Sequence, residues 1–121
     1  MSRQRAKGTR WETAIRDYLA DEGVEVHRQP AHGVNDKGDL HVGTDVVVEA
    51  KNQERHSLAE WLDEATAEAH NAGRPVGVVW FHRRGKASPR DGYVLLDGST
   101  LVYLLREAGM TGRALTPKET R

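Results

Sequence analysis

The chain has 121 residues, contains no cysteine and carries 18 basic and 18 acidic residues, so its formal net charge is zero. This length predicts a single domain, residues 1–121, whose core needs no disulfide, and the lack of cysteine excludes a thiolate metal site and a Cys nucleophile. Because no apolar run could cross a bilayer and no signal segment follows the first residues, we expect a cytoplasmic protein without membrane contact.

Charges of opposite sign are separated along the chain. Residues 1–10 and 82–90 carry basic residues and no acid, whereas residues 54–68 carry five acidic residues and one arginine. This separation is typical of a protein with one face that binds a polyanion such as nucleic acid. Solvated loops would give the same pattern, so charge alone leaves both interpretations open.

The first predicted element is an amphipathic helix. Apolar residues within positions 11–19 recur with a helical period, Thr9 and Glu12 have the spacing of a capping box, and Gly23 marks the end. We therefore expect the helix to begin at Thr9 and residues 1–8 to form a flexible basic arm.

Three extended segments follow this helix. Residues 24–27 alternate apolar and polar side chains as in a half-buried strand, and residues 31–38, with two glycines and an Asn-Asp pair, are typical of a loop. The alternation resumes at residues 40–42 and 46–51, which are separated by the three residues 43–45. These two segments predict a hairpin.

The middle of the chain predicts a helix followed by a buried strand. An apolar stripe runs through residues 58–72, which are preceded by a capping box of Ser57 with Glu60 and followed by Gly73. Residues 76–81 are almost continuously apolar. This run predicts a strand that is covered on both faces and lies at the centre of the sheet.

The last third of the chain predicts shorter elements. We expect a basic loop at residues 82–91, a strand at 93–96, a helix at 99–108 and a flexible tail at 110–121. The predicted order is therefore α-β-β-β-α-β-β-α. This order indicates an α/β or α+β fold in which helices flank a mixed central sheet.

Charged residues on the predicted hairpin suggest a catalytic site. Alternation places Glu49 and Lys51 on one face, and if Val42 faces Val46, counting outward places Asp39 opposite Glu49 at a Cβ separation of roughly 4.5 to 5.5 Å. Two opposed carboxylates repel, and a Mg²⁺ ion that also binds water and phosphate would relieve them. Lys51 could hold a phosphate oxygen or a nucleophile derived from water. An ordinary exposed face, with Lys51 neutralising Glu49, explains the same residues.

The spacing of these charged residues resembles that of a nuclease superfamily. Gly38-Asp39, nine further residues and then Glu49-Ala50-Lys51 resemble the D…(D/E)-x-K core of the PD-(D/E)XK nucleases. Additional residues resemble the archaeal-type and phage Holliday junction resolvases of that superfamily: Lys7, Gly8, Glu12, Gly23 and Arg28. The resemblance extends over residues 7–81 and implies a restriction-endonuclease-like core.

The resemblance implies roles for individual residues. Asp39, Glu49 and the backbone carbonyl of Ala50 would bind Mg²⁺, for which Mn²⁺ could substitute, Glu12 would complete the site, and Lys51 would assist the attacking water. A capping box would also be a sufficient reason for Glu12. The candidate DNA contacts are the residues of the two basic segments, Arg28 and a histidine in the loop before Asp39: Arg3, Arg5, Lys7, Arg10, Arg28, His32, Arg83, Arg84 and Lys86.

Three features depart from the pattern of these resolvases. Gly38 stands where a proline usually precedes the first catalytic acid, and Trp80 stands where a lysine is expected on the strand after the second helix. The basic function of that lysine is expected from Arg83, Arg84 and Lys86 instead. The archaeal enzymes carry a serine in the loop after the arginine, whereas the loop here is longer and offers His32.

The functional hypothesis from the sequence is a Mg²⁺-dependent DNA endonuclease. The resemblance implies a Holliday junction resolvase that acts as a homodimer on four-way junctions in recombination or repair. Two alternatives stay open: a nuclease of the same fold that acts on another DNA structure in repair or restriction, and a DNA-binding module that does not cleave.

Overall fold

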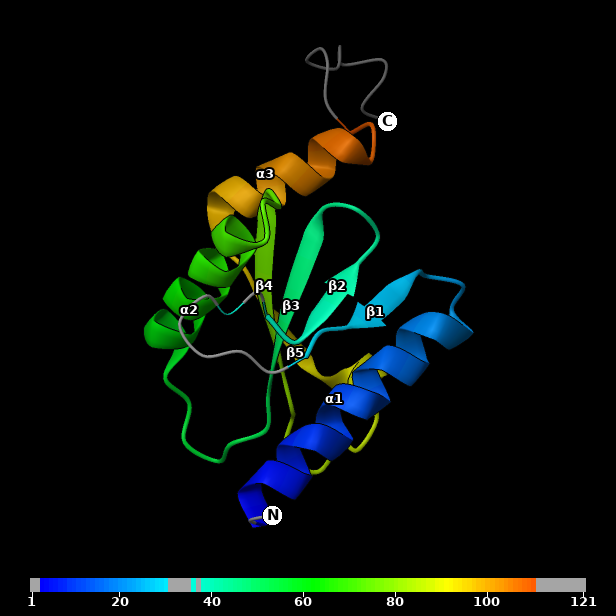
Figure 1. The fold of residues 1–121 in the computed structure, drawn as a ribbon, viewed down its shortest axis with the longest axis vertical. Helices are drawn as coiled ribbons and strands as arrows, with labels where there is room; N and C mark the ends of the chain where they lie inside the picture. Colours follow the sequence, from blue (N-terminus) through cyan, green and yellow to red (C-terminus); the bar gives the residue numbers. More distant parts are fainter. Residues whose placement is uncertain (1–2, 31–35, 37, 111–121) are drawn as a thin grey trace, which may run out of the picture.

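The computed structural model describes residues 3–30, 36 and 38–110 of the chain. In this part, one five-stranded sheet is flanked by α-helices (Figure 1). The elements in chain order are α1 (Arg3–Asp21), β1 (Val26–Arg28), β2 (Leu40–Val42), β3 (Val46–Lys51), α2 (Leu58–Asn71), β4 (Val76–Phe81), the 3-10 helix η1 (Pro89–Asp91), β5 (Tyr93–Leu95) and α3 (Gly98–Glu107). No helix among the described residues has both the length and the apolar character needed to cross a bilayer.

The sheet is mixed, with the strand order β1-β2-β3-β4-β5. Neighbouring strands are antiparallel except β3 and β4, which run parallel and are connected through α2. The predicted order of helices and strands is confirmed, with η1 as an addition. The prediction for residues 76–81 is right about burial on both faces, but β3 is the middle strand because only β5 lies beyond β4.

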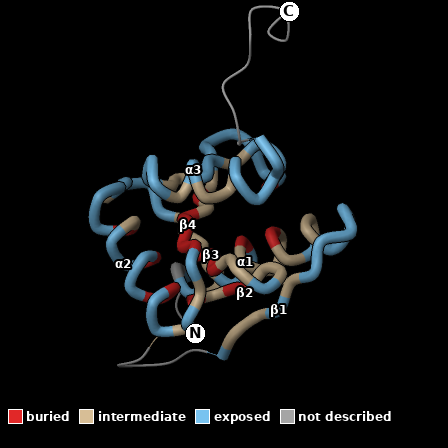
Figure 2. Tube along the Cα trace, turned by 90° about the horizontal axis from the view of Figure 1, so that it is seen from above, coloured by how far each residue is buried: buried red, intermediate tan, exposed pale blue. Residues whose placement is uncertain are grey.

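Helices cover both faces of the sheet, and each face has its own hydrophobic core. On the face covered by α1, the buried residues are Trp11, Ile15, Leu40, Val48, Val76 and Val78, and residues of α3 pack against them. On the face covered by α2, they are Trp61, Ala65, Val79 and Phe81. Figure 2 shows the buried positions in red along the central strands and on α1 and α2.

A glycine lets α2 approach the sheet closely. A Cβ atom at Gly77 of β4 would collide with the backbone carbonyl oxygen of Ala65, so a larger residue there would push the helix away. Because α2 also packs on β3, this close approach determines how near the side chains of α2 come to those of the middle strand.

The start of α1 corrects one prediction. The helix begins at Arg3 rather than Thr9, so Thr9 and Glu12 lie inside it and do not form a capping box. Most of residues 3–8 are good helix formers, and the single Gly8 does not stop the helix that continues into the apolar stripe. The flexible arm expected at residues 1–8 is therefore wrong for residues 3–8, and residues 1–2 lie outside the described part.

The other boundaries agree with the sequence to within about two residues, which is the usual scatter of helix and strand ends. Gly23 and Gly73 follow α1 and α2 with φ values of 79° and 68°, which is the left-handed conformation expected after a helix. Ser57 is the N-cap residue of α2, but its side chain makes no capping bond, and α3 is capped by Asp97. The tail expected at residues 110–121 lies outside the described part beyond Met110.

Candidate active site

The hairpin has the predicted register. Val42 pairs with Val46 across a turn of residues 43–45, and Gly43 in this turn has a φ of 56°. Asp39 lies immediately before β2, and its backbone N–H donates to the carbonyl oxygen of Val48. Its Oδ2 accepts a hydrogen bond of 2.8 Å from the backbone N–H of Ala50. This bond holds the Asp39 carboxyl beside the end of β3.

Gly38 shapes the approach to Asp39. Its φ of 89° is not accessible to proline, and a Cβ atom there would collide with the Cγ1 of Val47. The departure from the expected proline therefore has a local physical reason, since the backbone turns here in a conformation that favours glycine.

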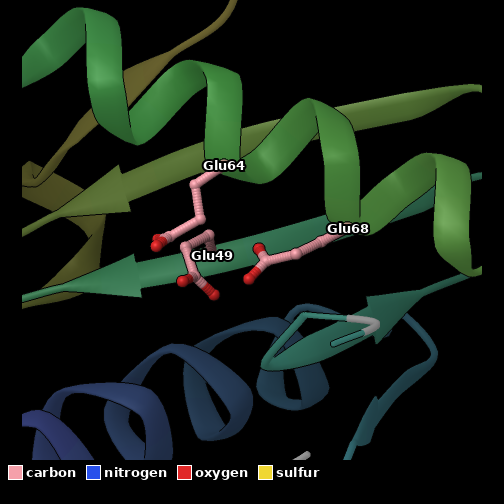
Figure 3. Close-up of side chains that lie close together, drawn as sticks. All are labelled: Glu49, Glu64 and Glu68. Carbon is pink, nitrogen blue, oxygen red and sulfur yellow. The ribbon is translucent and has the colours of Figure 1, made fainter. Parts of the chain in front are cut away.

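Glu49 and Lys51 lie on the same face of β3, as predicted, but this face is not open. Helix α2 covers it, and only 7% of the Glu49 surface is exposed. Two glutamates of α2, Glu64 and Glu68, point from the helix toward Glu49 (Figure 3). The idea of an exposed sheet surface is therefore wrong, because the connection from β3 to β4 passes over these side chains.

Lys51 is held by two of these acids. Its Nζ lies 2.7 Å from the Oε1 of Glu64 and 3.5 Å from the Oε2 of Glu49. Burial lowers the pKa of Lys51, but its hydrogen bond to Glu64 and the charge of Glu49 outweigh this effect and raise the pKa overall. Lys51 therefore carries a positive charge at neutral pH and has a fixed orientation.

Burial and mutual repulsion raise the pKa values of three acids near Lys51, whereas burial of Glu64 is outweighed by its hydrogen bonds to Glu49 and Lys51, which lower the pKa. Burial raises the pKa of Glu49 strongly, and the carboxyl groups of Glu64 and Asp39 raise it further. Burial also raises the pKa of Asp39. For Glu68, burial and the charge of Asp36 raise the pKa to about 8. Without a bound cation, Glu49 and Glu68 therefore keep protons at neutral pH.

Glu12 reaches this region from α1 and is paired with Arg28. The Nε of Arg28 lies 3.0 Å from the Oε1 of Glu12, and its Nη2 donates to the Oγ1 of Thr13. Burial and the nearby charge of Asp39 raise the pKa of Glu12, against the opposing effect of Arg28. Arg28, a candidate DNA contact, is thus bound to α1.

One cleft contains all four predicted catalytic residues. It has a volume of about 790 Å³, and Glu12, Asp39, Glu49 and Lys51 are among the residues that line it. The cleft is also lined by Arg3, Arg5 and Lys7, from the first turns of α1. Acidic side chains and a cluster of basic ones therefore border the same space.

The remaining candidate DNA contacts among the described residues do not line this cleft. Arg84 lines a second pocket of about 390 Å³, which shares Lys7 with the cleft. The guanidinium carbon of Arg83 lies 5.5 Å from the centre of the Tyr93 ring, and Arg83 forms a β-bridge with Lys86. Arg10 is exposed on α1 and does not line the cleft. His32 falls outside the described residues.

The sequence analysis missed Glu64 and Glu68 as members of the site. A signal for Glu68 was present, because it follows Ala65 by three residues and shares the inward face of α2 with Ala69. An acid at an apolar helix position indicates a polar environment in the core. Glu64 offered no such signal, since it is half exposed and lies within a run of acids.

The donor set is suited to a hard divalent cation. The Oε1 atoms of Glu49 and Glu68 are buried and have no hydrogen-bond partner among the described residues. Carboxylate and carbonyl oxygens are the ligands of Mg²⁺ and Mn²⁺, and the site contains no sulfur ligand. In an extended strand, the N–H and C=O of one residue point to the same side, so the Ala50 carbonyl lies on the Asp39 side of β3.

Comparison with known proteins adds no relationship: the chain matches no protein-family model, and a search of curated proteins finds no match.

Proposed function

We propose that the protein is a metal-dependent DNA endonuclease with a site of the PD-(D/E)XK type. One observation carries the proposal: Asp39, Glu49 and Lys51 border a cleft that is also lined by the basic residues at the start of α1. The cleft thus combines acids that could bind a cation, a lysine that could contact a phosphate, and basic groups that attract a polyanion.

The fold supports this proposal. The helix, the three antiparallel strands, the crossover helix and the parallel strand follow one another in the order that the resemblance implies for a restriction-endonuclease-like core. One acid directly precedes β2 and the other lies on β3, and the lysine follows the second acid by two residues. We assign the domain to this kind of core as part of the proposal.

Asp39, Glu49 and the Ala50 carbonyl would hold Mg²⁺, and Mn²⁺ could replace it. When bound, such a cation supplies Lewis acidity toward the phosphate and lowers the pKa of a coordinated water. Asp39 is kept in place by its hydrogen bond from the backbone of Ala50. Glu49 gives up its proton as a ligand, because only the ionised carboxylate binds a metal well.

Lys51 would hold the attacking water or stabilise the charge that develops on the phosphate. Its ammonium group is ionised and is oriented by Glu64 at 2.7 Å, at the border of the cleft. Glu12 would complete the acidic side of the cleft from α1, with Arg28 setting the orientation of its carboxyl group.

DNA would enter from the basic side of the cleft. Arg3, Arg5 and Lys7 line the cleft, and Arg84 lines the pocket next to it. Lys7 lines both spaces, and contacts of such basic residues with phosphates give sequence-independent affinity that falls with salt.

The narrower proposal is a Holliday junction resolvase that acts as a homodimer. A four-way junction is nearly two-fold symmetric, and a domain with one site supplies two cuts as a C2 dimer. The apolar faces of α2 and β4 are covered in the fold and β4 is paired on both edges, so neither is free for a partner. Exposed apolar side chains of β5 and α3 include Tyr93, Val94, Leu101 and Val102, and a second copy would find apolar surface there.

Cleavage of matched DNA substrates tests both levels of this proposal. Labelled four-way junction, splayed duplex and linear duplex are incubated with the protein at one salt concentration, with Mg²⁺ or with a chelator. A resolvase cuts the junction symmetrically in a Mg²⁺-dependent way and is dimeric by light scattering. Mg²⁺-dependent cutting of another substrate would keep the nuclease and reject the resolvase, and DNA binding without any cutting would favour the non-cleaving alternative.

A further inference from the structure

The space between β3 and α2 contains three glutamates that face one another. Glu49 on β3 and Glu64 and Glu68 on α2 each offer a carboxylate oxygen, and these three atoms lie within 4.8 Å of one another (Figure 3). Glu64 and Glu68 are one helical turn apart, so both carboxyl groups lie on the side of α2 that faces Glu49. Three carboxylates from two elements can surround a single ion.

A second observation points to a ligand in this space. The Oε1 atoms of Glu49 and Glu68 are buried without a hydrogen-bond partner among the described residues. Only 3% of Glu68 and 7% of Glu49 is exposed. A buried acceptor without a donor destabilises the fold, and more so when it is charged, so these two oxygens need a positive or hydrogen-bonding partner.

When all of its acids are ionised, the cluster carries more negative charge than one divalent ion can neutralise. The carboxyl groups of Asp39, Glu49, Glu64 and Glu68 interact with one another, and the ammonium group of Lys51, which is paired with Glu49 and Glu64, belongs to the same cluster. When all are ionised, their net formal charge is three negative charges. One divalent cation at Asp39 and Glu49 leaves an uncompensated negative charge on the α2 side. Glu12 does not add to this count because Arg28 pairs with it.

The burial of Glu68 lowers the stability of the metal-free fold. It lies on the inward face of α2 next to Ala65 and Ala69, where an apolar side chain would contribute to the core. Ligand binding explains a buried acid at such a position better than packing does.

We infer that Glu49, Glu64 and Glu68 form a second divalent-cation site, for Mg²⁺ or Mn²⁺, on the α2 side of β3. It shares Glu49 with the cation site of the proposed function, and only in this respect does it rest on that function, because binding of the ion requires no cleavage. The ion takes the buried oxygens of Glu49 and Glu68 as ligands. Glu64 donates a carboxylate oxygen to the ion, and its ion pair with Lys51 orients the lysine.

Counting bound Mn²⁺ tests this inference without any activity measurement. Electron paramagnetic resonance of the free ion gives the number of Mn²⁺ ions bound per chain for the full-length protein in the absence of DNA. We expect two ions for the unchanged protein and one for Glu68→Gln. Asp63→Asn, which removes an exposed acid from the same helix, is the matched control and should still bind two.

The variant Asp39→Asn separates this inference from the proposed function. It should also bind one ion, because it removes a ligand of the other site only. If the unchanged protein binds one ion, lost in Asp39→Asn and kept in Glu68→Gln, the second site does not exist and the proposed function stands. If no variant differs from the unchanged protein in ion count, the inference fails.

A folding control accompanies the count. Circular dichroism and urea unfolding without metal should show Glu68→Gln to be as stable as the unchanged protein or more stable, since it removes an acid from a repelling cluster. Should Glu68→Gln not fold, Glu64→Gln replaces it, because the half-exposed Glu64 tolerates an amide. Loss of one ion in that variant supports the site, and retention of both overturns it.

Discussion

The protonated state of Glu49 makes the stability of the metal-free protein depend on pH. Only 7% of the Glu49 surface is exposed, its carboxyl group lies among other acids, and burial and these neighbours raise its pKa well above the ordinary value of 4.5. In the unfolded chain it ionises near the ordinary value. At neutral pH, unfolding therefore releases a proton, and stability falls as the pH rises from the unfolded pKa toward the folded one.

The size of this effect follows from the linkage relation. Each carboxyl group that stays protonated only in the folded state lowers the free energy of unfolding by about 1.4 kcal/mol per pH unit. Between about pH 5 and about pH 8, Glu49 alone could remove up to ~4 kcal/mol, a large part of the ~5 to 15 kcal/mol typical of a domain. Glu68 adds to the slope until its pKa of about 8 is reached.

Glu49→Gln is the perturbation that isolates this contribution. The amide has nearly the shape of the protonated acid and does not titrate, so the variant should match the unchanged protein at the acidic end of the range. At the basic end it should be more stable by about 1 to 4 kcal/mol. Asp63→Asn, an exposed change on α2, should leave the slope unaltered.

Urea unfolding in the presence of a chelator, followed by circular dichroism across the pH range, measures these differences. In a second series without the chelator, Mg²⁺ should stabilise the unchanged protein more at high pH than at low pH, because the ion competes with the protons on its ligands. Equal slopes for the unchanged protein and Glu49→Gln would refute the claim that Glu49 is protonated in the folded state.

Three further predictions concern residues around the cleft. Gly38→Ala should destabilise the protein by about 1 to 3 kcal/mol in urea unfolding, because its positive φ and the contact with Val47 leave no room for a Cβ atom. Glu12→Gln should lower the cleavage rate while costing about 1 kcal/mol or less in stability, since it weakens a partly exposed ion pair with Arg28; full activity would leave Glu12 a structural partner only. Lys7→Ala should reduce the log-log salt slope of DNA binding by about 0.9, and an unchanged slope would place the DNA elsewhere.

Periodic patterns were sufficient to predict most of the fold. The hairpin register followed from alternation and a three-residue turn, because a slip by one residue would turn Glu49 toward the core that Val48 occupies. The ends of α1 and α2 followed from glycines that adopt positive φ. The start of α1 was not predicted correctly. The spacing of a capping box at Thr9 also occurs inside helices, and the helix-forming residues before Thr9 extend the helix to Arg3.

Apart from Glu12, which was predicted from the family resemblance, the candidate site was predictable only as far as its residues are local in sequence. Asp39, Glu49 and Lys51 share one hairpin, so strand geometry alone brings them together. The covering of Glu49 by α2 depends on which face the crossover to β4 passes over, and no local pattern specifies that. The approach of Glu68 to Glu49 also depends on Gly77, which lets α2 lie close to the sheet. No pattern in the sequence shows that Gly77 contacts α2.

Strand cleavage by single-residue variants tests the central claim most directly. The unchanged protein, Asp39→Asn and Lys51→Ala are incubated with labelled four-way junction and Mg²⁺, and junction binding by each is measured in a chelator. The account predicts that the unchanged protein cuts the DNA only with the metal, and that both variants bind it but cut at least about a hundredfold more slowly, as expected for loss of electrostatic stabilisation of the transition state. Cutting by Asp39→Asn at the normal rate, or cutting by the unchanged protein in chelator, would contradict the account.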